Sequence, residues 1–129
     1  MREKELRMTI KAIVFDIGGV LEFTPDLGVD VKWEQKLNLK LGELNERLHE
    51  VWRGRSIGTI KIEQVDTRIS EIMGWSAVQV NEYMEDVWRE YLGTLHVELA
   101  EYFRSLRSKY KTAILSSSFV GTREKEVGY

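Results

Sequence analysis

The chain contains no cysteine and a single proline, Pro25, among its 129 residues. Without cysteine there are no disulfide bonds and no thiol chemistry, which fits the cytosol, where thiols stay reduced. A charge bias is also lacking, because 19 basic and 21 acidic residues leave a formal net charge of −2. This balance argues against nucleic acid or an anionic membrane as the main partner. We therefore expect a cytoplasmic protein without a nucleic-acid or membrane partner.

Long apolar runs, internal repeats and low-complexity tracts are absent as well. The longest apolar run is far shorter than the roughly 20 residues that a transmembrane helix needs. The charged start, MREKELRMT, leads into a strand pattern rather than a signal-peptide core, so no targeting segment is expected. Hydrophobic residues nevertheless make up 43% of the chain, which predicts an ordered domain with its own core.

The most informative stretch is IKAIVFDIGGVL, residues 10–21. Its apolar run ends abruptly at Asp16, and a run of this length with β-branched members is typical of a strand buried on both faces. Gly18 and Gly19 follow, where the backbone can turn tightly and approach a ligand closely. Because ligands in open α/β sheets bind outside the carboxyl ends of the strands, Asp16 is well placed to be a nucleophile or a metal ligand. The alternative is that Asp16 only caps the turn.

Apolar residues recur at helical spacing between residues 31 and 109, after a loop at 22–30. Gly54 and Gly58 interrupt this pattern and predict a loop at 53–59. Ser76 and Gln79 predict a capping box at a helix start, and Gly74 predicts a left-handed cap at the preceding helix end. A second buried strand is expected at 110–115, ended by three serines, and another helix near residue 120. The expected helices cover residues 31–39, 41–52, 62–73, 77–92 and 95–109.

Two buried strands joined through a helix should lie parallel and adjacent, which puts Asp16 and Ser116 at the same edge of the sheet. The Ser116 hydroxyl and the backbone N–H groups of the following helix start can hold an anion. An Asp beside such a site can attack phosphorus and form an acyl-phosphate, which splits one difficult hydrolysis into two steps. Mg²⁺ would then be needed to offset the repulsion between carboxylate and phosphate.

These two stretches resemble the first and second signatures of the haloacid dehalogenase (HAD) superfamily. VFDIGGVL at residues 14–21 is similar to a strand that ends in a nucleophilic Asp, and ILSS at 114–117 to a strand that ends in a phosphate-binding Ser or Thr. The resemblance covers essentially the whole chain. It implies an α/β fold with a Rossmann-like HAD core, its parallel sheet incomplete, and an inserted α-helical cap. The implied division is core at 1–21, cap at 22–93 and core at 94–129.

The resemblance also implies an activity, a Mg²⁺-dependent phosphatase that hydrolyses a small phosphorylated metabolite through an aspartyl-phosphate. Asp16 would be the nucleophile and a Mg²⁺ ligand, and Gly18 would offer its backbone carbonyl to the metal. Ser116 would bind the phosphate, assisted by backbone N–H groups near Ile17, Gly18 and Ser117.

Two departures from the family pattern lower the activity expected of this chain. Gly18 stands where phosphatases of the superfamily usually have a second Asp as general acid/base, and glycine cannot shuttle a proton. The later Lys and acidic residues of the family are missing, because charged residues after Ser118 occur only at 123–126. The sequence therefore resembles the N-terminal part of a HAD hydrolase, truncated after the second signature, with little or no activity as written.

Two other functions stay open. In the first, the truncated fold would act as a non-catalytic binding or interaction module that uses its cap surface or its open sheet edge, and the edge would also allow self-association. A phospho-accepting receiver domain also sets an Asp and a Ser or Thr at strand ends, but the long helical insert after Asp16 disfavours it.

Arginines and histidines offer further candidates for a site. Arg53 and Arg55 are expected to be solvated loop charges, with contact to an anionic substrate as the alternative. His49 and His96 lack partners at metal-ligand spacing, which favours a structural or solvated role.

Overall fold

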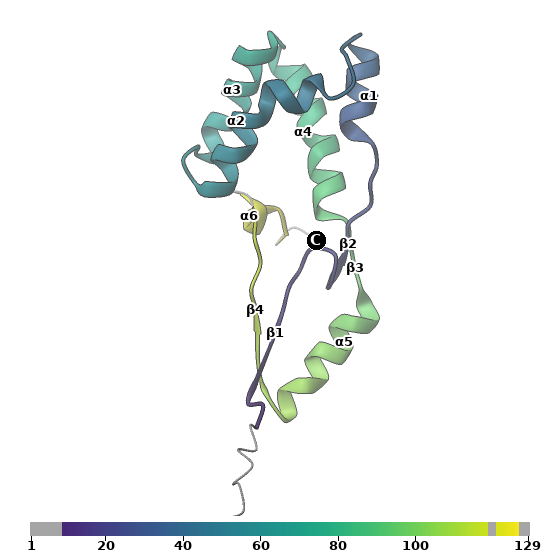
Figure 1. Ribbon diagram of the computed structural model, residues 1–129, viewed down its shortest axis with the longest axis vertical. Helices are drawn as coiled ribbons and strands as arrows, with labels where there is room; N and C mark the ends of the chain where they lie inside the picture. The colour runs from purple at the N-terminus through teal and green to yellow at the C-terminus, as the bar shows by residue number, and fades with distance from the viewer. Residues whose placement is uncertain (1–8, 119–120, 127–129) are drawn as a thin grey trace, which may run out of the picture. The chain divides into compact units, whose positions relative to one another are not determined.

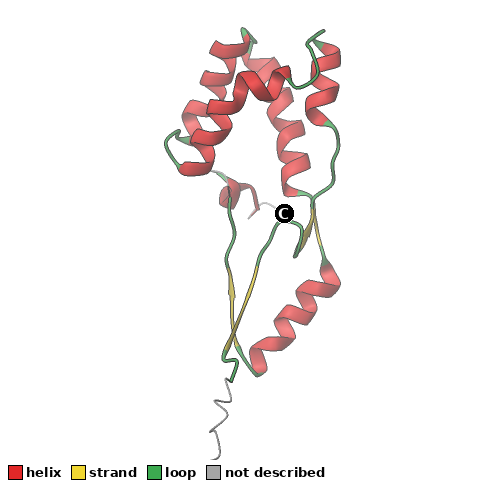
Figure 2. Cartoon of the chain, viewed as in Figure 1, coloured by secondary structure: helices red, strands yellow, loops and turns green. Residues whose placement is uncertain are grey.

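The structure is a computed structural model that describes residues 9–118 and 121–126 (Figure 1). The described residues divide into two compact units. One unit lies within Met1–Phe23 and Thr94–Ser116, and the other within Thr24–Gly93 and Ser117–Tyr129. The strands belong to the first unit, whereas the second is built from helices (Figure 2).

The first unit is organised on a two-stranded parallel sheet formed by β1 (Ala12–Phe15) and β4 (Lys111–Ile114). The chain enters β4 from helix α5 (Val97–Ser105) through a short 3-10 turn. The helix packs on the sheet through Phe103, whose ring centroid lies 4.5 Å from that of Phe15. The prediction of two adjacent parallel strands is therefore confirmed.

The expected burial of both strands on both faces is wrong. Val14 is 57% exposed and Leu115 is 76% exposed. A strand is buried on both faces only where a layer of helices covers each face. Among the described residues of this unit, α5 supplies one layer, so the face that carries Val14 stays open.

A short antiparallel pair, β2 (Glu22–Phe23) with β3 (Thr94–Leu95), completes the first unit. His96 follows β3 and fixes the junction with α5. Its N–H donates to the carbonyl of Leu21 at 2.7 Å, its Nδ1 accepts from the first turn of α5, and its ring stacks on Phe23. The sequence predicted a loop and a helix start here, because strands of two residues carry no periodic pattern.

Among its described residues the second unit has five helices, and the first four of them share one hydrophobic core. No helix in the described ranges combines the length and the apolar character needed to cross a membrane. The helix expected near residue 120 begins at Thr122, after a turn at Gly121, and residue 120 itself lies outside the described ranges. The helices are α1 (Val29–Lys36), α2 (Glu43–Ile57), α3 (Ile62–Met73), α4 (Ala77–Leu92) and α6 (Thr122–Glu126).

The core of the second unit is rich in aromatic side chains at helical spacing. Trp33 on α1 is 2% exposed and packs against Trp75 and Tyr83, with ring centroids 5.6 and 5.5 Å away. These aromatic positions build the core, as their spacing predicted. The buried core residues are Val29, Trp33, Leu44, Leu48, Val51, Val65, Ile69, Trp75, Val80, Tyr83 and Met84.

Asp86 ties α4 to α1. Its Oδ2 accepts hydrogen bonds from Lys32 Nζ at 2.8 Å and from Trp33 Nε1 at 2.9 Å. Arg89 on the same helix donates to its Oδ1 at 3.2 Å. These hydrogen bonds, that of Lys32 first, hold the pKa of Asp86 below its ordinary value.

Helix α4 begins at the capping box that the sequence predicted. The Oγ of Ser76 accepts from the N–H of Gln79 at 3.2 Å, and the Gln79 side chain accepts from the N–H of Ser76 at 3.0 Å. The predicted capping box is therefore confirmed. Gly74, at φ 68°, is the predicted left-handed cap of α3.

The loop expected at 53–59 is wrong for most of its length, because α2 continues through Gly54 to Ile57 and Gly58 is its left-handed cap. A Cβ atom at Gly54 would lie 2.5 Å from Cδ1 and Cγ1 of Ile60. Glycine is thus needed for close packing in the middle of the helix, although it costs about 1 kcal/mol there relative to alanine. Consequently Arg53 and Arg55 lie on a helix.

Candidate active site

The carboxyl ends of β1 and β4 meet at one edge of the parallel sheet. Phe15 pairs with Ile114, and the N–H of Leu115 donates to the carbonyl of Phe15 at 3.0 Å. Asp16 comes next on the first strand, and Ser116 follows Leu115 on the second. The structure therefore brings the two predicted residues to the same sheet edge, while their catalytic roles stay predictions.

Asp16 opens a tight turn after β1. Its Oδ1 accepts the N–H of Ile17 at 2.7 Å, and its side chain is exposed. The carbonyl of Ile17 accepts from the N–H groups of Val20 at 3.1 Å and Glu22 at 3.0 Å. Gly19, at φ 69°, supplies the left-handed conformation that the turn requires. This geometry fits both roles considered for Asp16. One oxygen caps the turn, and the carboxylate is exposed to solvent, as a nucleophile or metal ligand would be.

Gly18 lies in the same turn, but neither the surrounding atoms nor its backbone conformation requires glycine at this position. Apart from its chain neighbours, no heavy atom of the described residues lies within 4 Å of the place where its Cβ would stand. The residue also lies outside the positive-φ region. A side chain at position 18 would therefore fit, and the missing acid/base group is a difference in chemistry rather than a packing requirement.

The two serines after β4 differ in environment. Ser116 is partly buried, whereas Ser117 is exposed. The sequence placed a helix start close behind them, but α6 begins only at Thr122. Its N–H groups are thus separated along the chain from Ser116, and the phosphate-binding roles of Ser116 and Ser117 stay predictions.

A metal would find few protein ligands at this edge. Among residues 9–118 and 121–126, no three His, Asp or Glu side chains gather into a set that would hold a metal ion. Mg²⁺, however, usually keeps several waters and binds through one or two carboxylates and the phosphate of its substrate. The exposed carboxylate of Asp16 and the backbone carbonyl of Gly18 fit an ion held in that way.

Arg55 is the residue that the sequence misjudged most. It is 2% exposed on α2, whereas Arg53 is exposed, as expected of a solvated charge. Its guanidinium carbon lies 4.8 Å from the ring centroid of Trp88 and 5.4 Å from that of Trp52. Burial lowers its pKa. Its burial could have been predicted from its position four residues after Val51, which puts it on the apolar face of the helix.

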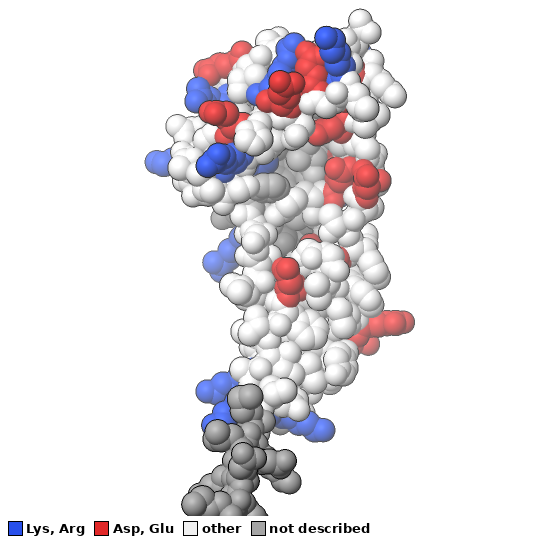
Figure 3. All heavy atoms as spheres, in the orientation of Figure 1, with Lys and Arg blue, Asp and Glu red and all other residues white. Residues whose placement is uncertain are grey.

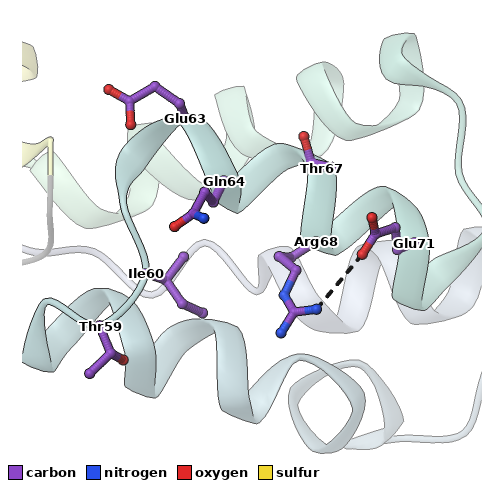
Figure 4. Close-up of a pocket in the computed structure, with 7 residues that line it drawn as sticks. All are labelled: Thr59, Ile60, Glu63, Gln64, Thr67, Arg68 and Glu71. Atoms are coloured by element: carbon purple, nitrogen blue, oxygen red, sulfur yellow. Dashed lines mark ion pairs between the residues drawn. The ribbon is translucent and has the colours of Figure 1, made fainter.

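Two surface features carry no candidate site. A hollow beside α3 is lined by the turn at Thr59 and Ile60 and by exposed side chains, among them the ion pair of Arg68 and Glu71 at 3.8 Å (Figure 4). On the face drawn in Figure 3, acidic and basic side chains are interspersed rather than gathered by sign.

No protein-family model and no curated protein matches the sequence. Solved structures do match it. A HAD family enzyme from Bacteroides thetaiotaomicron has a TM-score of 0.70 and 22% identity over 93% of this chain. A second structure, of the wild-type enzyme in complex with magnesium and inorganic phosphate, has a TM-score of 0.67 and 22% identity over 90%. A protein from Porphyromonas gingivalis, described as a predicted HAD-like family hydrolase, has 0.61 and 24% over 85%.

These likenesses establish the fold. The chain has the α/β fold of HAD family enzymes, which confirms the predicted fold class and, at the level of the fold, the resemblance that the two strand-end motifs indicated. It spans 59%, 57% and 52% of the chains in the three structures.

Proposed function

We propose that the chain carries the nucleophile and phosphate-binding segments of a HAD-like, Mg²⁺-dependent phosphatase that acts on a small phosphorylated metabolite. The observation that carries this proposal is the arrangement of β1 and β4, which end together at Asp16 and Ser116. Ligands bind outside the carboxyl ends of strands in sheets of this kind. The magnesium and phosphate bound to the Bacteroides enzyme lend further support.

The chemistry starts at Asp16. Its Oδ1 is held by the N–H of Ile17, so Oδ2 attacks phosphorus, and the bond from phosphorus to the leaving oxygen breaks. Ser116 donates its hydroxyl to a phosphoryl oxygen. Water then attacks the phosphorus of the aspartyl-phosphate, which releases phosphate and restores the carboxylate. Bound Mg²⁺ would supply the positive charge that lets carboxylate and phosphate approach.

Gly18 lowers the rate of phosphate release that we expect. General acid–base catalysis contributes roughly 10²–10⁴-fold, and glycine supplies no proton to the leaving oxygen. In this chain the leaving oxygen takes its proton from water. We therefore expect slow turnover.

The helices inserted between β1 and α5 serve as the cap in this proposal. The sequence-based division assigned residues 22–93 to that insert. That division stays a prediction.

Phosphate release from a panel of small phosphomonoesters, measured with and without Mg²⁺, tests the proposal. The purified chain should release phosphate only with Mg²⁺, and Asp16→Asn should abolish the release. Asp26→Asn is a matched control, because Asp26 is an exposed loop carboxylate that accepts the N–H of Gly28. The proposal fails if the folded chain shows no release or if Asp16→Asn leaves the rate unchanged.

A second candidate is a non-catalytic module that self-associates. The observation in its favour is the open face of the parallel sheet, where Val14, Ala113 and Leu115 are exposed. Sedimentation over a range of concentrations separates the two functions. A dimer that survives Asp16→Ala but is lost in Leu115→Glu supports the module, whereas a monomer at all concentrations removes it.

A further inference from the structure

The turn after β1 lacks an acid that would protonate a leaving group. Residues 17–21 of this turn have no ionisable side chain. Gly18, two residues after Asp16, is exposed. Within 4 Å of the place where its Cβ would stand, the described residues put no heavy atom apart from those of its chain neighbours. This part of the sheet edge is therefore open to solvent, and water is its source of protons.

Two ionisable residues lie next to this turn, and both are tied into the packing of the first unit. Glu22 forms a backbone bridge with Gly18 and pairs with Leu95 in the β2–β3 sheet. It is half-buried and already has an interaction partner. His96 accepts a backbone N–H of α5 at its Nδ1, at 3.2 Å, and its ring stacks on Phe23. These contacts give both residues a structural role and leave protonation of a leaving group to water.

The lack of an acid matters most for the oxygen that leaves phosphorus. In the loose transition state of phosphoryl transfer the bond to the leaving oxygen is largely broken, so negative charge builds up on that oxygen. A general acid neutralises this charge and accelerates the step by roughly 10²–10⁴-fold. Without the acid, the rate depends on how well the leaving oxygen holds a negative charge. Alkoxides are strong bases and leave slowly, whereas phenolates, carboxylates and phosphates are much weaker bases.

We propose that the substrate of this site carries its phosphoryl group on a weakly basic oxygen, as in an aryl phosphate, an acyl phosphate or a phosphoric anhydride. The inference rests on the proposed function and narrows its substrate class. Oδ2 of Asp16 forms the bond to phosphorus, the bond from phosphorus to the leaving oxygen breaks, and the electron pair of that bond stays on the oxygen. The leaving group departs as an anion without a proton from the protein. Water then hydrolyses the aspartyl-phosphate.

Four small phosphates that differ in their leaving group test the proposal. The 4-nitrophenyl and phenyl esters release phenols, benzyl phosphate releases an alcohol of similar size, and acetyl phosphate releases a carboxylate without a ring. The quantity compared is kcat/KM with Mg²⁺, because it reports transfer to Asp16 and not the later hydrolysis. The value for 4-nitrophenyl phosphate should exceed that for benzyl phosphate by at least about 10²-fold, the lower end of what a general acid contributes. Phenyl phosphate should lie between them, and acetyl phosphate should group with the 4-nitrophenyl ester.

Variants at Gly18 and Glu22 identify the source of this dependence. Gly18→Asp supplies an acid, so kcat/KM for benzyl phosphate should rise by about 10²-fold or more, while that for 4-nitrophenyl phosphate changes by less than about threefold. Gly18→Ala fills the same space without a carboxyl group, so it should keep the ratio of the two values. Glu22→Gln should keep the ratio as well, because Glu22 gives no proton to the leaving oxygen. Should Gly18→Asp fail to fold, the ratio in the unmodified chain decides.

The outcomes separate this inference from the proposed function. Release from none of the four phosphates, or release that persists in Asp16→Asn, removes the proposed function and this inference with it. Release that depends on Asp16 but has similar kcat/KM for 4-nitrophenyl and benzyl phosphate overturns the inference alone. A ratio that stays the same in folded Gly18→Asp, or that grows in Glu22→Gln, also overturns it. Acetyl phosphate that reacts as slowly as benzyl phosphate would show a preference for the ring instead of the leaving oxygen, which contradicts the inference.

Discussion

The side chain of Ile60 occupies the space that a Cβ atom at Gly54 would need, with Cδ1 2.5 Å from the position of that atom. The turn that brings Ile60 back onto α2 is closed by the backbone of the same glycine. The carbonyl of Gly54 accepts the N–H groups of Thr59 at 3.0 Å and Ile60 at 3.2 Å. The end of α2 is thus packed against its own following turn.

Gly54→Ala should therefore destabilise the helical unit by about 1–3 kcal/mol, the usual cost of overpacking, although alanine favours a helix. The urea midpoint of tryptophan fluorescence measures this, since all four tryptophans lie in that unit. Ile60→Ala makes room for the new methyl group, so the double variant should lose less than the two single losses combined. Strictly additive losses would show that the two residues do not compete for space.

Ser76→Ala removes the side-chain acceptor of the capping box at the start of α4. The N–H of Gln79 then loses its partner, and the free energy of unfolding should fall by about 1 kcal/mol. Ser56→Ala is the control, because Ser56 is exposed within α2 and donates to the carbonyl of Trp52 on its own helix. Its effect should stay within about 0.5 kcal/mol. Equal losses in both variants would count against a specific cap.

Asp86 should make the helical unit sensitive to acid. Its pKa is lowered in the folded state, so its contribution is complete above the ordinary value of 3.8 and is lost as the pH falls through the folded pKa. At pH 7, Asp86→Asn should lose about 1–3 kcal/mol, because Lys32 and Trp33 donate to a charged carboxylate that is 14% exposed.

The comparison of Asp86→Asn with the unmodified chain is made by urea unfolding at pH 7 and at pH 3. Other carboxylates titrate in both proteins and cancel in the difference. The difference should shrink at pH 3, and a constant difference would contradict the assigned role. Glu82→Gln on the same helix is the control. Glu82 is exposed, its Oε2 lies 3.7 Å from Nζ of Lys36, and an exposed ion pair of this kind contributes about 0–1 kcal/mol to the free energy of unfolding.

Gly18→Asp should raise phosphate release, because space for a side chain exists and the carboxyl group would serve as general acid/base. The expected gain is up to about 10²–10⁴-fold, the usual contribution of such a group. Gly18→Ala is the matched control, since it fills the same space without a carboxyl group and should leave the rate unchanged. An equal rate in all three proteins would show that protonation of the leaving oxygen does not limit turnover.

The sequence predicted the features that depend on local chemistry. Ser76 and Gln79 marked a helix start by hydrogen bonds within three residues, and Asp16 marked a strand end by an abrupt change of polarity. Features that depend on distant partners were missed. Gly54 was interpreted as a helix break, because glycine disfavours helices. The sequence does not show that the side chain of Ile60 packs against this position in the fold.

Burial was harder to predict than secondary structure. Arg55 carries a charge and was expected in solvent, but aromatic rings from α2 and α4 cover it. Val14 is apolar and was expected to be buried, but the described residues of its unit supply a helix on one face of the sheet. Both errors arise because burial is decided by neighbours far away in the sequence.

The central claim is that Asp16 forms a bond to phosphorus during turnover. The most direct measurement is a mass spectrum of the peptide that contains Asp16, after the chain has reacted with a small phosphomonoester and Mg²⁺ and has been quenched with acid. The account predicts a phosphoryl group on Asp16 that is absent without Mg²⁺ and absent in Asp16→Asn. Phosphate release without any phosphoryl group on this peptide, or a phosphoryl group on Ser116 instead, would contradict it.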